Sequence, residues 1–197
     1  MNKNILPFRP DWGVPAPLLK DLLEKGKRFN IEEIIPFSPK EINVAQWVSL
    51  KCRYGCSRYG TSWCCPPATP GLDKVEQLLS EYSLAFLLVG TQHFPEFYKN
   101  NHQKRLRQIR SWKGTISLER ALFLDGYYKA FSLVGEACAL CKECAYPEDC
   151  RFPAERRPSL ESLSIDVIGT LKKLGRTPRI AQHHCEAYSY YAIILVE

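Results

Sequence analysis

The chain has 197 residues, of which 45% are hydrophobic and 24% charged, and its formal net charge at pH 7 is +6. These values are ordinary for a soluble globular protein, and we expect one domain that spans residues 1–197. No apolar run reaches the roughly 18 residues of a membrane span and no secretion signal is visible, so we expect a cytoplasmic protein without a membrane partner.

The first half of the chain is expected to alternate between helices and strands. Leucines at helical spacing over 15–28 predict a short amphipathic helix, within an N-terminal helical extension of about residues 1–43. Residues 45–50 alternate between apolar and other side chains and predict a strand. After a Pro-Gly break, a helix is expected over 72–82, and the unbroken apolar run 84–89 predicts a buried strand.

The second half continues the alternation. A helical pattern covers 95–124 with an interruption near Gly114, and 128–134 predicts a strand. A helix capped by Ser159 is expected to run to residue 174, and 187–196 predicts a terminal strand. Together these elements predict a single α/β domain with a mixed sheet of about four or five strands flanked by helices. Two cysteine-rich metal-binding loops lie at the joints between elements.

Nine cysteines are the strongest functional signal. An odd number without a secretion signal argues against disulfides, because the reducing cytosol keeps thiols free to bind metals. Cys138, Cys141 and Cys144 are separated by two residues each, which suits one face of a 4Fe-4S cluster, and Cys150 follows at a less regular spacing. Zinc is the alternative, but zinc sites usually use two well-separated cysteine pairs, so the triplet favours iron-sulfur.

A first cysteine group supplies three more thiolates, from Cys52, Cys56 and Cys65. Cys64 directly precedes Cys65, and adjacent side chains diverge, so both rarely bind one metal ion. We assign the ligand to Cys65 because the Pro-Pro dipeptide that follows it fixes its direction. The fourth position stays open among Cys64, Cys185, a neighbouring histidine and no protein ligand at all.

Basic residues are scattered except in two places. The run from Lys104 to Arg110 is expected to be a solvated helix face, because a nucleic-acid groove would interleave a denser basic stripe with aromatic side chains. This pattern argues against a nucleic-acid partner. If the helix expected at Ser159 points its N-terminus at the second cysteine group, it would stabilise a negatively charged cluster, with help from Arg156 or Arg157. A plain surface helix with solvated arginines explains the same residues.

Several motifs resemble, in the same order, those of the predicted metal-binding proteins catalogued as domain of unknown function 2284. They are the string KC..GC..YG..W.CPP from Lys51, LDGYYKA from Leu124, and the second cysteine group followed by RPSLE and IDV, within about residues 44–196. The resemblance implies a cysteine-rich iron-sulfur protein of bacteria or archaea, often anaerobes, with no settled activity. Carried over by position, the metal ligands are Cys52, Cys56, Cys65, Cys138, Cys141, Cys144 and Cys150.

We therefore expect a protein with one or two 4Fe-4S clusters that transfers electrons or supports a partner enzyme, with a redox protein as partner. One alternative is an enzyme that acts on a small-molecule substrate through an iron left open by the three-cysteine group. Another is a zinc-stabilised interaction module. Replacing Cys141 with serine is expected to remove close to one cluster's iron, and replacing Cys64 to leave the metal content nearly intact.

Overall fold

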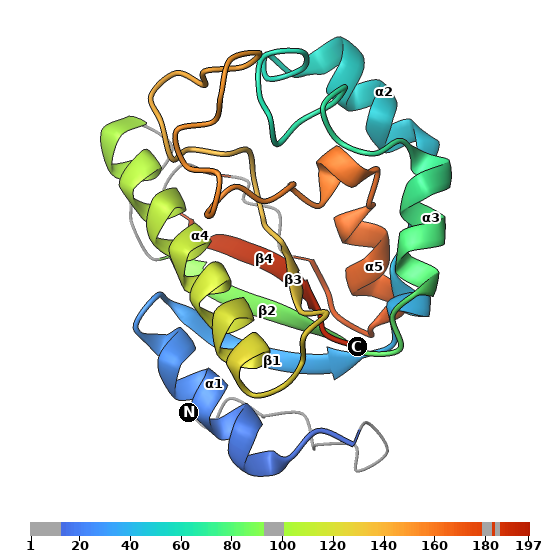
Figure 1. Cartoon of the computed structure of the whole chain (residues 1–197), viewed down its shortest axis with the longest axis vertical. Coiled ribbons are helices and arrows are strands. Elements are labelled where there is room, and N and C mark those ends of the chain that lie inside the picture. Colours follow the sequence, from blue (N-terminus) through green and yellow to red (C-terminus); the bar gives the residue numbers. More distant parts are fainter. Residues whose placement is uncertain (1–12, 93–100, 179–182, 184–185) are drawn as a thin grey trace.

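A sheet forms the middle layer of the protein. The computed structural model describes residues 13–92, 101–178, 183 and 186–197. Its four strands lie in the order β1-β2-β4-β3 (Figure 1), and every neighbouring pair is antiparallel. The strands are β1 (Ile31–Phe37), β2 (Ala85–Gln92), β3 (Phe131–Leu133) and β4 (Tyr188–Leu195).

Helices cover both faces of the sheet. Within the described residues they are α1 (Ala16–Lys27), α2 (Gln46–Gly55), α3 (Leu72–Ser80), α4 (Asn101–Leu124) and α5 (Val167–Lys173), with 3-10 turns η2 (Pro39–Glu41) and η3 (Glu161–Leu163). Helices α1 and α4 lie on one side, and α3 and α5 lie on the other (Figure 1). Helix α2 lies at one end of the molecule, beyond the sheet, and so helps to build that end rather than the core.

Strand β2 is buried on both faces. Phe86 and Leu88 belong to a cluster with residues of α1 and α4, whereas Leu87 and Val89 belong to a cluster with residues of α3 and α5. Because successive side chains of a strand point to opposite faces, a strand between two helical layers needs an unbroken apolar sequence. This three-layer arrangement confirms the predicted single α/β domain, but its four-stranded sheet is antiparallel and not mixed as predicted.

Most elements expected from periodicity are present. The segment expected as a strand over 128–134 is reduced to the short β3, and residues 95–100 of the expected long helix lie outside the described residues. The elements confirmed in type and place are α1, α3, β2 and β4.

Strand β1 lies within the segment 1–43 that we expected to be a helical extension. It pairs with β2 and forms one edge of the sheet. Its Pro36 lacks an N–H group, which an edge strand tolerates because one side of the strand makes no ladder hydrogen bonds. Arg176 donates to both carboxylate oxygens of Glu33, at 2.9 and 2.8 Å, and ties this edge to the chain after α5.

The strand predicted over 45–50 is wrong, because these residues begin helix α2. Val48 is buried at 4% exposure, whereas Trp47 and Leu50 are 46% and 56% exposed. A strand would have placed Val48 and Leu50 on the same face, and only a helix turns them apart. The segment lies away from the sheet, none of whose four described strands pairs with it, and a helix satisfies its own backbone groups.

The interruption predicted near Gly114 is also wrong, because α4 runs unbroken from residue 101 to residue 124. A Cβ atom at Gly114 would overlap the side chain of Phe29. The glycine therefore marks a close approach between α4 and the turn after α1, not a helix end. The expected stop after residue 124 is confirmed, with Gly126 at a φ of +102°.

Ser159 does not begin the predicted helix. The backbone around it makes a parallel bridge with Val134, in which the Val134 N–H donates to Pro158 and the Leu160 N–H donates to Val134. Those hydrogen bonds hold the chain extended at this point. The Ser159 side chain accepts instead from the Ser162 N–H, at the short η3 turn. Helix α5 begins later, at Val167.

Candidate metal centre

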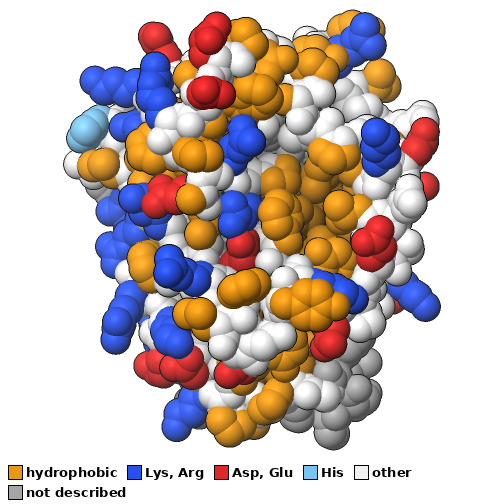
Figure 2. Space-filling model, in the orientation of Figure 1, with side chains coloured by type: hydrophobic (Ala, Val, Ile, Leu, Met, Phe, Trp, Pro, Cys, Tyr) orange, Lys and Arg blue, Asp and Glu red, His pale blue; other side chains and the backbone are white. Residues whose placement is uncertain are grey.

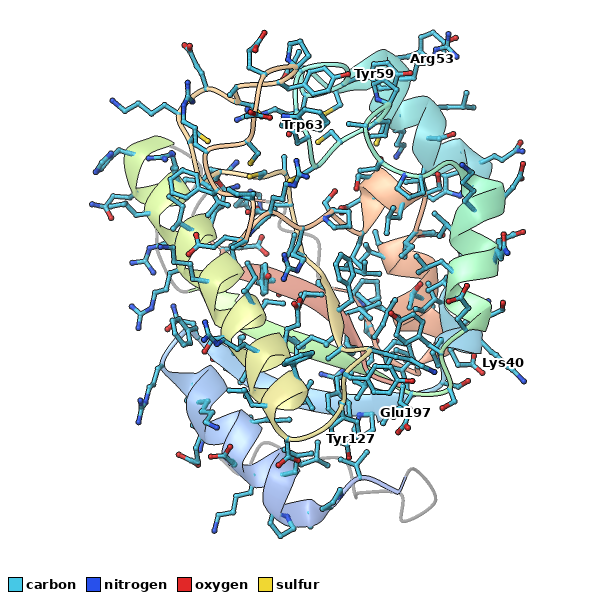
Figure 3. All side chains as sticks on the ribbon, in the orientation of Figure 1. Lys40, Arg53, Tyr59, Trp63, Tyr127 and Glu197 are labelled. Atoms are coloured by element: carbon cyan, nitrogen blue, oxygen red, sulfur yellow. The ribbon has the colours of Figure 1, made fainter. Side chains whose placement is uncertain are left out.

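The cysteines gather at one end of the molecule. All eight cysteines among the described residues are free thiols, and Cys185 lies outside those residues. Figure 3 shows sulfur atoms around the labelled Tyr59 and Trp63, beyond the end of the sheet. Two loops form this end, one after α2 and the other after β3 (Figure 1).

The first cysteine group is brought together in space. Cys52 lies in α2, where its thiol donates to the Glu161 backbone oxygen at 3.7 Å, and Cys56 directly follows the helix. Cys65 is buried in the loop, and burial, together with the nearby Cys56 and Cys52, raises its pKa to about 11. Burial and the neighbouring Cys56 likewise raise the pKa of Cys52. These three predicted ligands are therefore electrostatic neighbours.

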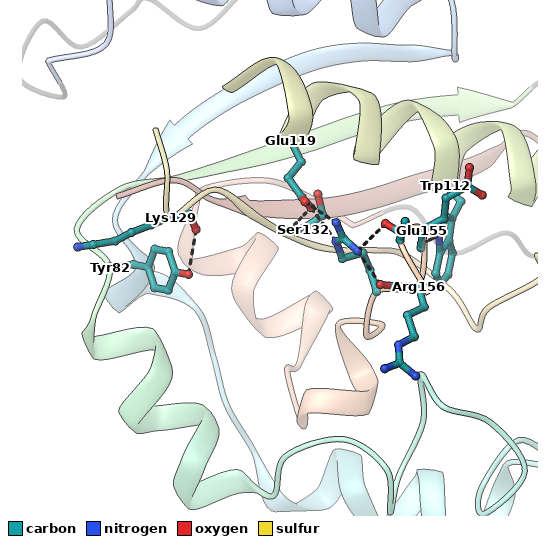
Figure 4. A network of polar contacts seen from close by, with 9 residues as sticks. Tyr82, Trp112, Glu119, Lys129, Ser132, Glu155 and Arg156 are labelled. Carbon is teal, nitrogen blue, oxygen red and sulfur yellow. Dashed lines mark hydrogen bonds and ion pairs between the residues drawn. The ribbon is translucent and has the colours of Figure 1, made fainter. Parts of the chain in front are cut away.

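The second cysteine group lies in the loop after β3, which side chains of α4 hold in place. Arg105 donates to the Leu140 backbone oxygen at 2.9 Å. The indole N–H of Trp112 donates to the Glu155 backbone oxygen at 2.8 Å (Figure 4). Helix α4 thus fixes both the beginning and the later part of the loop. The loop carries four half-buried thiols, which belong to Cys138, Cys141, Cys144 and Cys150.

Cys64 belongs with the second group, although it lies in the first loop. It is buried in an apolar cluster with Trp112, Leu140 and Cys138. The thiols of Cys64 and Cys138 interact as hydrogen-bond partners, which raises the pKa of Cys64 and lowers that of Cys138 to about 7. The adjacent Cys64 and Cys65 therefore point to different groups.

Trp63 joins the two loops. Its indole N–H donates to the Glu148 backbone oxygen at 2.7 Å, and its ring meets that of Tyr146 edge to face, with centroids 5.0 Å apart. The guanidinium of Arg156 lies 5.2 Å from the Trp63 ring centroid, a cation–π distance. Sequence reasoning placed Trp63 in a motif but gave it no part in holding the second loop.

Arg58 is the cation that acts on both groups. Its positive charge contributes to lowering the pKa of Cys65 and of Cys138, against the effect of burial on each. A positive charge near thiols favours their thiolate forms. Its position inside the first cysteine motif could have indicated this role, but from the sequence we considered Arg156 and Arg157 instead.

Arg157 does not serve the cysteines as expected. Its guanidinium pairs with Glu119 of α4, at 2.9 and 2.5 Å, and the two side chains are only 15% and 11% exposed. Glu119 also accepts from the Ser132 N–H of β3 at 2.8 Å (Figure 4). This buried pair fastens the loop to α4 and β3. Arg157 is therefore a structural ion-pair partner and not the solvated side chain that was one of the two alternatives.

The donor set fits a soft metal in its chemistry. Thiolates are the ligands that iron-sulfur clusters and zinc take up, and each group holds neighbouring thiols. Within the described residues, no set of three or more Cys, His, Asp or Glu side chains is close enough to surround one metal ion. Metal binding would therefore have to draw the thiols of each group together.

Outside the cysteine end, the surface carries a basic run along α4 and a pocket. Lysine and arginine side chains line the α4 edge of the face in Figure 2, but Arg105 and Arg110 donate to backbone oxygens of neighbouring segments, so the run is only partly a solvated face. A surface pocket of about 410 Å³, lined by Lys40, Tyr82 and Glu197 among others, lies at the opposite end from the cysteines. No helix in the described part of the chain could span a membrane.

Comparison with protein families gives one match. A family model described as "Predicted metal-binding protein (DUF2284)" matches residues 36–196, which include every cysteine of both groups. The matched segment also contains β1 from Pro36 onward, all later elements, and the loops that Trp63 joins. Comparisons with curated proteins and with solved structures found no match.

Proposed function

The chain belongs to the predicted metal-binding family named domain of unknown function 2284, and from that premise we propose that it binds one or two 4Fe-4S clusters and transfers electrons to or from a partner protein. One observation carries this proposal: eight free thiols lie at one end of the fold, in two neighbouring groups. Protein iron-sulfur clusters are held by cysteine thiolates, usually four for each cluster.

The surroundings of the thiols support a cluster rather than a simple reactive thiol. Cys64 and Cys138 lie in an apolar pocket beside the buried Trp112, which excludes water from that side. Arg58 provides positive charge that acts on Cys138, and Arg156 lies over the ring of Trp63, the residue before Cys64. Burial, positive charge and hydrogen bonds around the sulfur atoms are the means by which a protein sets the potential of a cluster.

The exposed side of α2 supports a redox protein as the partner. Trp47, Leu50 and Tyr54 are exposed along the helix that carries Cys52, and Lys51 and Arg53 lie over the Trp47 and Tyr54 rings. Aromatic and basic side chains of this kind favour a partner that presents an acidic surface with an apolar centre. Electrons would then leave or enter near the first cysteine group.

A second candidate is an enzyme that uses an open iron of the first group on a small-molecule substrate. It is favoured by the direction of Cys64, which lies with Cys138 and leaves the first group with three described thiols. An iron with no protein ligand can act as a Lewis acid. Cyanide added to the reduced protein is the probe, because an open iron binds it and changes the EPR spectrum, whereas a fully ligated cluster does not respond.

Metal analysis tests the main proposal. We expect protein purified without oxygen to be brown, with about four or eight iron atoms and as many acid-labile sulfides per chain, according to whether one or two clusters are bound. Replacing Cys141 with serine should remove close to one cluster's iron. Lys142→Ala is the matched control, because Lys142 is exposed, lies in the same loop and has no thiol. Colourless protein with stoichiometric zinc would refute the redox function and indicate a zinc-stabilised interaction module.

A further inference from the structure

Among the described cysteines, Cys64 is the one whose position in the structure agrees least with the predicted set of metal ligands. The family resemblance left Cys64 out of the ligand set, yet it is only 4% exposed and packs with Leu140 and Cys138 of the second loop. Cys138, the first member of the regular triplet, packs against the same buried cluster as Cys64, and the two thiols are hydrogen-bond partners. A buried thiol in contact with a metal-ligating thiol is in the right place to bind the same metal.

The triplet itself needs a ligand from elsewhere in the chain. Cys138, Cys141 and Cys144 provide three thiolates, and the 4Fe-4S cluster has four iron atoms to bind. Cys150, the ligand assigned by position, is separated from Cys144 by five residues, and its sulfur accepts from the Phe152 N–H at 3.4 Å. Cys64 reaches the triplet from the first loop, because Cys138 packs against the buried cluster that contains Cys64.

We propose that Cys64 is a ligand of the second metal site, in a set with Cys138, Cys141 and Cys144. The proposal rests on the proposed function, since it requires a metal at the second group. Binding releases the Cys64 thiol proton and exchanges its interaction with Cys138 for a bond from sulfur to metal. The adjacent Cys64 and Cys65 then hold two different sites, one on each side of a single peptide unit.

The first test replaces Cys64 with valine, which keeps the apolar pocket filled but cannot bind metal. We expect Cys64→Val to lose the same amount of iron as Cys141→Ser, close to one cluster per chain, while Cys150→Ser retains wild-type iron. Cys64→Val with wild-type iron content and an unchanged EPR spectrum would overturn the assignment. Wild-type protein without any cluster would instead refute the proposed function itself, so the two failures are distinguishable.

A second variant separates ligation from packing, because iron loss in Cys64→Val could also follow from a disturbed pocket. Serine can bind iron through its oxygen, and a ligand change of this kind shifts the g-values and the midpoint potential of the bound cluster. We expect Cys64→Ser to lose most of the iron of the second site, as Cys141→Ser does, and any cluster that it retains to show a shifted EPR spectrum and a changed potential. A Cys64→Ser cluster with wild-type spectrum and potential would show that Cys64 only packs beside the site.

Discussion

At the scale of single residues, Cys64 and Cys65 show most clearly that neighbours in the sequence can have different neighbours in space. The two are neighbours in the chain, and both are buried, but one interacts with Cys138 and the other with Cys52 and Cys56. Sequence reasoning anticipated that adjacent side chains diverge. It could not tell where Cys64 would go, because its partner lies 74 residues later in the chain.

The interaction between Cys64 and Cys138 predicts a pH dependence of thiol reactivity in the metal-free protein. The Cys64 thiol stabilises the Cys138 thiolate and lowers the pKa of Cys138 from the ordinary 9.0 to about 7. Because the thiolate is the form that reacts, alkylation of Cys138 by iodoacetamide should reach half its maximal rate near pH 7. In Cys64→Ala the interaction is lost, so the midpoint should move up toward the ordinary value.

Mass spectrometry of alkylated peptides over a pH series measures this midpoint for each cysteine. Cys65 is the internal comparison, since its pKa is raised to about 11 and its alkylation should stay slow at neutral pH in both proteins. An identical pH midpoint for Cys138 in the wild type and in Cys64→Ala would contradict the interaction between the two thiols.

At the scale of elements, tertiary neighbours decided the state of segments whose local pattern was ambiguous. Residues 45–50 alternate like a strand, but none of the described strands of the sheet pairs with them, and α2 begins at Gln46. Ser159 has a good capping pattern, but the bridge to Val134 uses the adjacent backbone groups and holds the chain extended. In both cases a short local pattern favoured one state. Hydrogen bonding to distant segments, or the lack of it, decided which state formed.

The helical state of α2 predicts unequal effects of two truncations. Val48→Ala should lower the free energy of unfolding by about 1–3 kcal/mol, because Val48 is buried at 4% exposure. Leu50→Ala should change it by less than about 0.5 kcal/mol, because Leu50 is 56% exposed. Chemical denaturation of both variants measures the difference, with the wild type as reference. Similar large losses for both would indicate the strand, in which the two side chains share a face.

At the scale of the whole molecule, the core and the cysteine end are separate. The two large apolar clusters pack on the faces of the sheet and contain no cysteine, whereas Cys64 and Cys138 belong to a small third cluster. Polar contacts with α4 fasten the second cysteine loop to the domain, among them the buried pair of Arg157 and Glu119. A metal at that end would therefore stabilise the loops more than the sheet.

Metal removal should accordingly affect the two parts unequally. After treatment with a chelator under reducing conditions, we expect the far-UV circular dichroism to stay close to that of the loaded protein, because β2 and β4 keep their apolar contacts on both faces. Amide hydrogen exchange should accelerate in the loops 56–67 and 138–152, and remain slow in β2 and β4. Cooperative loss of the circular dichroism signal would instead show that the fold depends on the metal.

The sequence by itself determined the layers of the domain and the chemical type of its candidate metal ligands. Apolar runs and helical spacing predicted α1, α3, β2 and β4, because their side chains face the core along the whole element. The cysteine spacing indicated metal ligation, since the residue type and its repeat are local properties. Strand β1 was missed, because its state depends on pairing with β2, whose residues lie 48 to 59 positions later in the chain.

Only the tertiary structure decided how the cysteine end is assembled. Trp63 holds the second loop, Arg58 acts on both thiol groups, and Arg157 is used in a buried pair with Glu119. The pairing of Cys64 with Cys138 likewise depends on how the two loops pack. These contacts join segments that are distant in the chain, and a local sequence pattern carries no information about which distant segment packing will bring close.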